Sequence, residues 1–180
     1  MYRRAYEIGD WIRVGETVGE VVGRSLLVTR LRTWKNETVA IPNSQITTME
    51  VANFTDLAKE RGLILHANVG IGYEVPWRRV EALLIEAANR TEGLDPDHSP
   101  FVLQKALGNF AVTYEINVYC NDPSKMPVLY ARLHRNILDV FHEAGVQIMT
   151  PNYVVESAEP KIAPPAGVAV SNSAKPSPAE

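Results

Sequence analysis

The histidines and the single cysteine are the side chains in this sequence best suited to catalysis or to metal binding. They are His66, His98, His134, His142 and Cys120. No two of them have the i, i+4 or Cys-x-x-Cys spacing that places ligands around one metal. His98 follows Asp95-Pro96-Asp97, an oxygen-rich run, but that tripeptide is first of all a turn signal. We therefore expect no metal site and no cofactor.

Motifs for covalent or phosphate chemistry are equally weak. Gly70-Ile71-Gly72 resembles the start of a phosphate-binding loop, but the third glycine is missing and no Gly-Lys-Ser/Thr occurs in the sequence. The sequence has no Gly-x-Ser-x-Gly nucleophile motif. Cys120 falls on the apolar side of an alternating segment, which favours a buried, unreactive thiol. The sequence predicts that the protein is not an enzyme.

A basic cluster, Arg30, Arg32 and Lys35, favours a different kind of site. In a strand, Arg30 and Arg32 would point to the same side, about 7 Å apart. With Trp11 and Trp34 they could bind and stack a single-stranded nucleic acid on an Sm-like module. The charge opposes this alternative, because the chain has a net charge of −3 and residues 1–53 carry 7 basic and 6 acidic groups.

The elements that must position these residues are short strands in the first third of the chain. Apolar and polar residues alternate there between closely spaced turn signals, which is typical of strands and hairpins. The predicted strands are Asp10–Val14, Thr17–Val22, Ser25–Thr33, Thr38–Ile41 and Met49–Asn53. They predict a five-stranded curled sheet or a small Sm/SH3-like barrel, which would also remove exposed strand edges.

Short motifs occur in a fixed order along these strands. They are Gly9-Asp10-Trp11-Ile12, Gly19-Glu20-Val21, Thr29-Arg30-Leu31-Arg32-Thr33-Trp34, Asn36-Glu37 and Ile41-Pro42-Asn43-Ser44. As an ordered set they resemble the cytoplasmic β-domain of the small-conductance mechanosensitive channel (MscS) family. Their role here is structural: Pro42 removes a strand donor, and the side chains of Asn43 and Ser44 can satisfy backbone groups. We assign Ile41-Pro42-Asn43-Ser44 no direct contact with an ion.

The resemblance implies a membrane channel built as a ring, usually of seven subunits. In that family the β-domain surrounds the space under the pore, and an α/β domain forms a perforated cytoplasmic vestibule. The full protein would open under membrane tension at the inner membrane and release ions and small osmolytes on hypo-osmotic shock. Arg30 and Arg32 would then pair with acidic residues between subunits or line the ring.

The membrane helices of such a channel are not recognisable in this sequence. No apolar run reaches about 18 residues. The start, Met1-Tyr2-Arg3-Arg4, lacks the apolar core of a signal peptide. We expect a soluble cytoplasmic part of a channel without its membrane helices, with Met1 as an artificial start. A natural soluble relative is the alternative.

The rest of the sequence predicts an α+β protein with a second domain. Residues 54–60 are expected to be a connector, and residues 61–156 follow the β-α-β-β-α-β order of a ferredoxin-like domain. Its predicted strands are Gly62–Ile71, Phe101–Leu107, Ala111–Cys120 and Val146–Met149. The first helix should begin at Pro76 and be capped by Gly93, and the second should be capped by Ser124 and end at Gly145.

The C-terminal segment, residues 157–180, differs in composition from the rest. It holds 5 of the chain's 12 prolines and almost no large apolar residue, so it is expected to be a flexible tail. In some members of the family the C-terminus instead joins a small terminal barrel. Val168–Val170 is the one candidate for such a strand.

Overall fold

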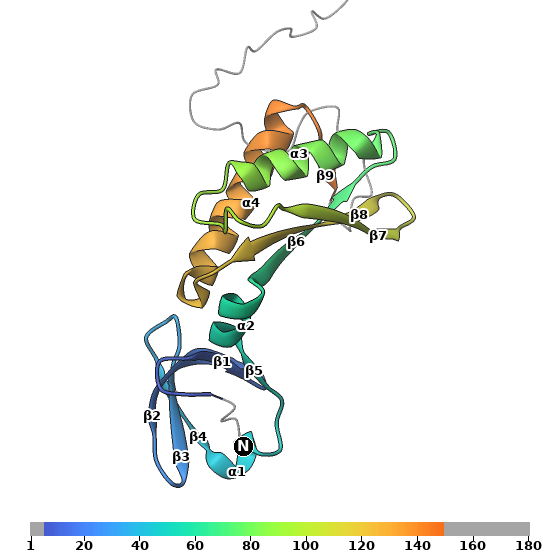
Figure 1. Cartoon of the computed structure of the whole chain (residues 1–180). Helices are drawn as coiled ribbons and strands as arrows, with labels where there is room; N and C mark the ends of the chain where they lie inside the picture. The colour runs from blue at the N-terminus through green and yellow to red at the C-terminus, as the bar shows by residue number, and fades with distance from the viewer. Residues whose placement is uncertain (1–5, 150–180) are drawn as a thin grey trace, which may run out of the picture.

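A computed structural model describes residues 6–149 and has an α+β fold with two antiparallel sheets. Figure 1 shows the sheets at opposite ends of an elongated molecule, with one short helix between them. Each sheet has its own hydrophobic core, and no residue belongs to both cores. The mixed α+β class expected from the sequence is confirmed. The predicted tail, its Val168–Val170 segment and residues 150–156 lie outside the described residues.

The first sheet contains the five predicted strands, paired in the order β4-β3-β2-β1-β5. They are β1 (Trp11–Val14), β2 (Thr17–Arg24), β3 (Val28–Arg32), β4 (Thr38–Pro42) and β5 (Val51–Asn53), with the short helix α1 (Asn43–Ile46) before β5. Two predictions are clearly too long. Met49 and Glu50 precede β5, and Ser25–Leu27, expected to be strand, forms the turn between β2 and β3. The Ser25 hydroxyl and backbone both bond to Val28, and this closes a tight turn.

Alternation places the apolar side chains of these strands on one face. The buried residues are Tyr6, Ile12, Val14, Val21, Leu31, Ile41 and Ile46. A bulge between Val21 and Gly23 shifts the register of β2 against β3, and bulges of this kind bend and twist a sheet. Gly19 lies where β2 and β3 approach closely. A Cβ at that position would lie 2.7 Å from the Arg32 carbonyl oxygen, so only glycine fits.

The second sheet follows the predicted β-α-β-β-α-β order and pairs its strands as β7-β8-β6-β9. Its elements are β6 (Leu63–Ile71), α3 (Trp77–Asn89), β7 (Phe101–Leu107), β8 (Val112–Cys120), the 3-10 turn η1 (Pro123–Lys125), α4 (Met126–Glu143) and β9 (Ile148–Met149). Alternate residues of β6 and β8 share a core with the apolar stripes of α3 and α4. Both helices therefore cover the same face of the sheet (Figure 1).

The expected connector is a helix, α2 (Phe54–Glu60). The Asn53 side chain caps it by accepting a 3.2 Å hydrogen bond from the Asp56 backbone N–H. The helix is tied to the first sheet because the Trp11 backbone N–H donates to the Thr55 hydroxyl over 2.8 Å. In Figure 1, α2 leads directly from β5 into β6.

Two predicted helix caps are wrong and one is correct. Ser124 does not cap the second long helix. Instead Asp122 accepts from the Ser124 backbone N–H and hydroxyl, because Pro123 starts an extra 3-10 turn before α4. Gly93 does not end α3, which stops at Asn89, although Gly93 has φ +92° in the following loop. Gly145 does end α4: at φ +66° it donates to the His142 carbonyl, and Val146 donates to Phe141.

Candidate functional site

Asn43, which directly follows Pro42, holds the turn between β2 and β3. Its side-chain nitrogen donates to the carbonyl oxygens of Ser25 and Leu26, each over 3.0 Å. Its backbone N–H donates to the Leu27 carbonyl over 2.8 Å. One residue therefore satisfies three consecutive carbonyl groups. We call this arrangement the Asn43 clamp.

The Asn43 side chain is also hydrogen-bonded to Thr29, a polar residue of the core with no exposed surface. The Thr29 hydroxyl donates to the Asn43 side-chain oxygen over 2.8 Å and lies 3.3 Å from the Tyr6 hydroxyl. The Arg24 guanidinium in turn lies 5.4 Å from the centre of the Tyr6 ring. The turn, the buried hydroxyl and the first described residue of the chain thus form one connected polar group.

Gly9 and Asp10 form the turn that starts β1. Gly9 has φ +97°, a left-handed conformation that favours glycine. Its N–H donates to the Val21 carbonyl, and the Val21 N–H returns a bond to the Asp10 carbonyl, both over 2.8 Å. The Asp10 carboxylate accepts from the Glu7 backbone and the Asn53 side chain. This geometry gives the motif a role in the fold.

Trp34 and Asn36 lie in the turn between β3 and β4. Asn36 has φ +61°, which asparagine tolerates better than most residues, and bonds between Thr33 and Glu37 close the turn. The Trp34 ring stacks on the Trp11 ring with centroids 5.0 Å apart and an angle of 18° between planes. The structure therefore brings the two tryptophans together, and each covers one face of the other.

The two arginines of the basic cluster, Arg30 and Arg32, are exposed on β3. Neither forms a salt bridge within residues 6–149. Ser44, the last motif residue, lies in α1, where its carbonyl accepts from the Thr47 hydroxyl. Arg30 and Arg32 are thus available to a partner, whereas the glycines, Pro42 and Asn43 shape the backbone.

Asp95 and His98 form a close polar pair in the loop between α3 and β7. The Asp95 side chain is only 2% exposed, and its carboxylate lies 2.6 Å from His98 Nδ1. The Asp97 backbone N–H, first, and the His98 hydrogen bond, second, hold the Asp95 pKa below its ordinary value. His98 stacks on Tyr119 with centroids 4.6 Å apart, beside a hollow of about 320 Å³. These contacts hold a loop, whereas the sequence pattern indicates only a turn at Asp95.

Groups suited to chemistry do not assemble elsewhere in the part of the chain that the structure describes. No three His, Cys, Asp or Glu side chains there gather around a common point that would hold a metal ion. Cys120 has no exposed surface, and burial raises the pKa of its thiol. None of the helices between residues 6 and 149 has the length and apolarity to cross a bilayer.

Comparison with known families identifies the class of protein. Residues 1–56 match the family model described as "Mechanosensitive ion channel, beta-domain", and residues 65–148 match "Mechanosensitive ion channel MscS, C-terminal". Both models describe parts of mechanosensitive channels, and this family is a family of channels and not of enzymes. The chain belongs to the MscS family, and the resemblance noted in its sequence is confirmed.

Individual relatives are distant but extend over most of the chain. An MscS family protein of Haemophilus influenzae is 23% identical over 148 residues, 82% of this chain and 13% of that protein. The small-conductance mechanosensitive channel MscMJ of Methanocaldococcus jannaschii is 22% identical over 158 residues, 84% of this chain and 43% of that protein. The chain therefore spans less than half the length of either relative.

A solved structure shares the fold. The crystal structure of Helicobacter pylori MscS in the closed state aligns with a TM-score of 0.69 at 16% sequence identity. The alignment covers 86% of this chain and 60% of that chain. Because only 16% of the aligned residues are identical, this likeness shows a shared fold and nothing more.

Proposed function

We propose that this chain is the cytoplasmic vestibule part of a mechanosensitive channel that releases ions and small osmolytes on hypo-osmotic shock. The observation that carries the proposal is the match of two channel family models, in order, to the two separate sheets. In this role the protein performs no covalent step. It shapes and supports a path for solutes at the cytoplasmic face of the inner membrane.

The proposed division of the chain follows from the element order. Residues 1–53 act as a small Sm/SH3-like β-domain, residues 54–60 as a connector, and residues 61–156 as a ferredoxin-like domain; residues 157–180 lie outside the described part of the chain. The strand order β7-β8-β6-β9 supports the ferredoxin-like assignment, since it places the first strand of the unit between the third and the fourth. The bulged five-stranded first sheet supports the barrel assignment.

The ring is the proposed assembly, with seven copies in the full channel. Closed rings form through heterologous contacts, in which one surface of a subunit meets a different surface of the next. Arg30 and Arg32, exposed and without an ion pair within residues 6–149, suit such a contact or the lining of the ring.

Light scattering of the purified chain over a wide range of concentrations tests the ring. We expect a species heavier than the monomer. Because no membrane helices are recognisable in this chain to strengthen the ring, the ring should be weak and its amount should rise with protein concentration. A strictly monomeric chain at millimolar concentration would contradict the proposal.

A single-stranded nucleic-acid-binding module is the second candidate function. The exposed Arg30 and Arg32, together with the Trp11–Trp34 stack, favour it. The net charge of −3 opposes it. An oligonucleotide-binding assay separates the two functions.

A further inference from the structure

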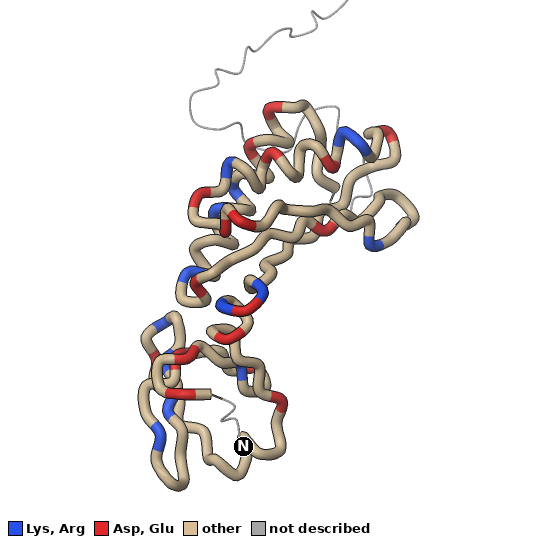
Figure 2. Tube along the Cα trace, viewed as in Figure 1, with Lys and Arg blue, Asp and Glu red and all other residues tan. Residues whose placement is uncertain are grey.

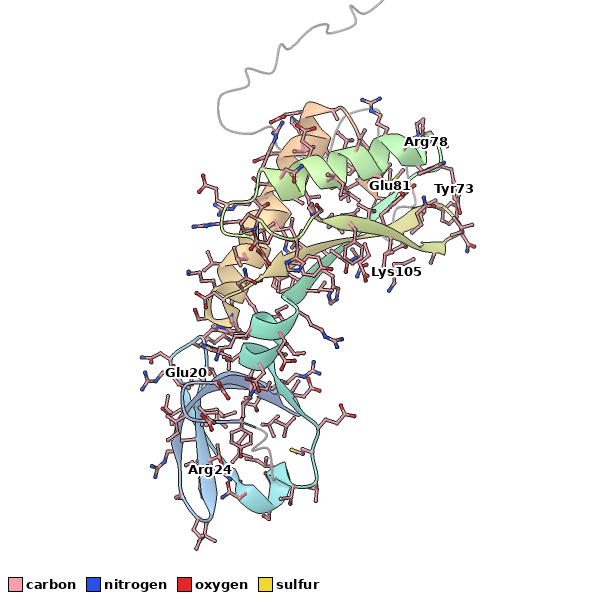
Figure 3. All side chains as sticks on the ribbon, in the orientation of Figure 1. Glu20, Arg24, Tyr73, Arg78, Glu81 and Lys105 are labelled. Atoms are coloured by element: carbon pink, nitrogen blue, oxygen red, sulfur yellow. The ribbon has the colours of Figure 1, made fainter. Side chains whose placement is uncertain are left out.

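The turn between β2 and β3 exposes two large apolar side chains side by side. Leu26 is 93% exposed and Leu27 is 74% exposed. In Figure 1 this turn forms the end of the molecule away from the second sheet. Figure 3 labels Arg24 toward this end of the hairpin and Glu20 toward α2. Adjacent, almost fully exposed leucines on a tight turn mark a surface that meets an apolar partner.

The Asn43 clamp makes this turn a rigid apolar tip. The carbonyl groups of Ser25, Leu26 and Leu27 all accept hydrogen bonds from Asn43. A bare carbonyl group would have to lose its water on entering an apolar medium, at a cost of several kcal/mol. These three carbonyl groups are already satisfied, so they add little to the cost of moving the tip out of water.

The charges around the tip identify the partner. Residues 21–36 contain Arg24, Arg30, Arg32 and Lys35 and no acidic residue. Arg24 and Arg30 lie nearest to the tip, since Arg24 pairs with Thr29 and Arg30 with Gly23. Figure 2 shows this hairpin with basic residues only near its free end. These arginines form no ion pair within residues 6–149, and apolar residues beside such basic ones are typical of segments that lie on anionic membranes.

We propose that Leu26 and Leu27 insert into the boundary between headgroups and acyl chains of an anionic bilayer, while Arg24 and Arg30 meet the lipid phosphates. The proposal goes beyond the vestibule function and does not depend on ring formation. Vesicle binding and oligomeric mass are separate measurements, so either proposal can fail alone.

The first experiment uses the buried cysteine to advantage. Cys120 is the only cysteine and has no exposed surface, so a Leu26→Cys variant of the full chain can be labelled selectively with an environment-sensitive dye such as NBD. We expect the emission to shift to the blue on adding phosphatidylcholine vesicles that contain phosphatidylglycerol. We expect little shift with phosphatidylcholine alone. Added salt should reverse the shift seen with the anionic vesicles, because it screens the attraction between the arginines and the lipid phosphates. The matched control is Leu107→Cys, at the other apolar hairpin end.

The second experiment measures partition by sedimentation with the same vesicles. Leu26→Ser with Leu27→Ser should lower the partition coefficient about tenfold or more, and Arg24→Gln with Arg30→Gln should also lower it. Leu107→Ser with Phe110→Ser should leave it unchanged, and unchanged circular dichroism would establish that each variant folds. Three outcomes would each overturn the proposal. The first is absence of vesicle binding, and the second is an equal emission shift for the dye at position 107. The third is a dye at position 26 that a second copy of the protein already shields from water when no vesicles are present.

Discussion

The Thr29 hydroxyl donates a 2.8 Å hydrogen bond to the Asn43 side-chain oxygen, and Thr29 is fully buried. This bond joins the Ile-Pro-Asn-Ser motif to the core of the first sheet. Asn43→Ala would remove a partner of a buried hydroxyl together with two bonds to the turn. Unsatisfied buried groups of this kind cost about 1–3 kcal/mol.

We therefore expect Asn43→Ala to lower the free energy of unfolding of the first sheet by about 1–3 kcal/mol. Urea unfolding followed by tryptophan fluorescence measures it, since Trp11 and Trp34 both belong to this part. Ser44→Ala is the control and should change the free energy by less than about 0.5 kcal/mol. Equal changes in the free energy of unfolding for the two variants would contradict the role of the Asn43 side chain in holding the turn.

Gly19 provides a steric prediction. Gly19→Ala places a Cβ 2.7 Å from the Arg32 carbonyl oxygen, a backbone atom that cannot move without shifting β3. We expect a loss of about 1–3 kcal/mol in urea unfolding, as for overpacked positions. Gly23→Ala, four residues along the same strand, meets no atom within 4 Å and should be neutral or slightly stabilising. A neutral Gly19→Ala would contradict the close approach.

Cys120 should react only when the protein opens. Its thiol is buried, and burial raises its pKa, so both access and thiolate formation are suppressed at neutral pH. Ellman's reagent should modify it very slowly in buffer and fully in denaturant. An introduced surface cysteine, Leu107→Cys, should react at once in the same assay. Fast reaction of Cys120 in the folded protein would contradict its burial.

Asp95 predicts how acid affects the protein. Its pKa is lowered in the folded state, so the stability it contributes is present above the unfolded-state value of about 3.9 and is lost as pH falls through the folded value. Asp95→Asn should therefore destabilise the protein at neutral pH and reduce the further loss seen below about pH 4. Thermal unfolding across pH measures this, with Asp139→Asn, on the exposed side of α4, as control. Parallel pH profiles for wild type and Asp95→Asn would refute it.

Nucleic-acid binding should be weak and non-specific. We expect single-stranded oligonucleotide to bind no tighter than about 10⁻⁴ to 10⁻⁶ M at physiological salt, because the overall charge is negative. Fluorescence anisotropy measures it, and Arg30→Glu with Arg32→Glu should change assembly more than oligonucleotide binding. Submicromolar, salt-sensitive binding that this variant abolishes would favour the nucleic-acid module.

Strict periodicity explains why most of the fold was predictable. In Leu63–Ile71 every second residue is buried and the residues between them are exposed or half-buried, and the observed β6 differs from the predicted strand by one residue. The missed features depend on contacts across the sequence. Asn43 reaches carbonyl groups 17 and 18 residues away, and nothing local to Ser25–Leu27 distinguishes a clamped turn from a strand. Ser124 does not cap α4 because Pro123 begins an extra 3-10 turn before that helix, and Asp122 caps this turn.

The separation of the two hydrophobic cores has a mechanical consequence. Two well-packed bodies that share no core residue should behave as stiff units connected in series, and we expect the segment between them to be more compliant than either body. That segment is α2, a helix of 7 residues whose first turn is fastened to β1 through Thr55 and to β5 through the Asn53 cap. A load applied at the leucine tip would therefore bend the molecule at α2 before it disturbed either sheet. We therefore expect the bending stiffness of residues 6–149 to depend mainly on this one helical segment and the few hydrogen bonds that fasten it.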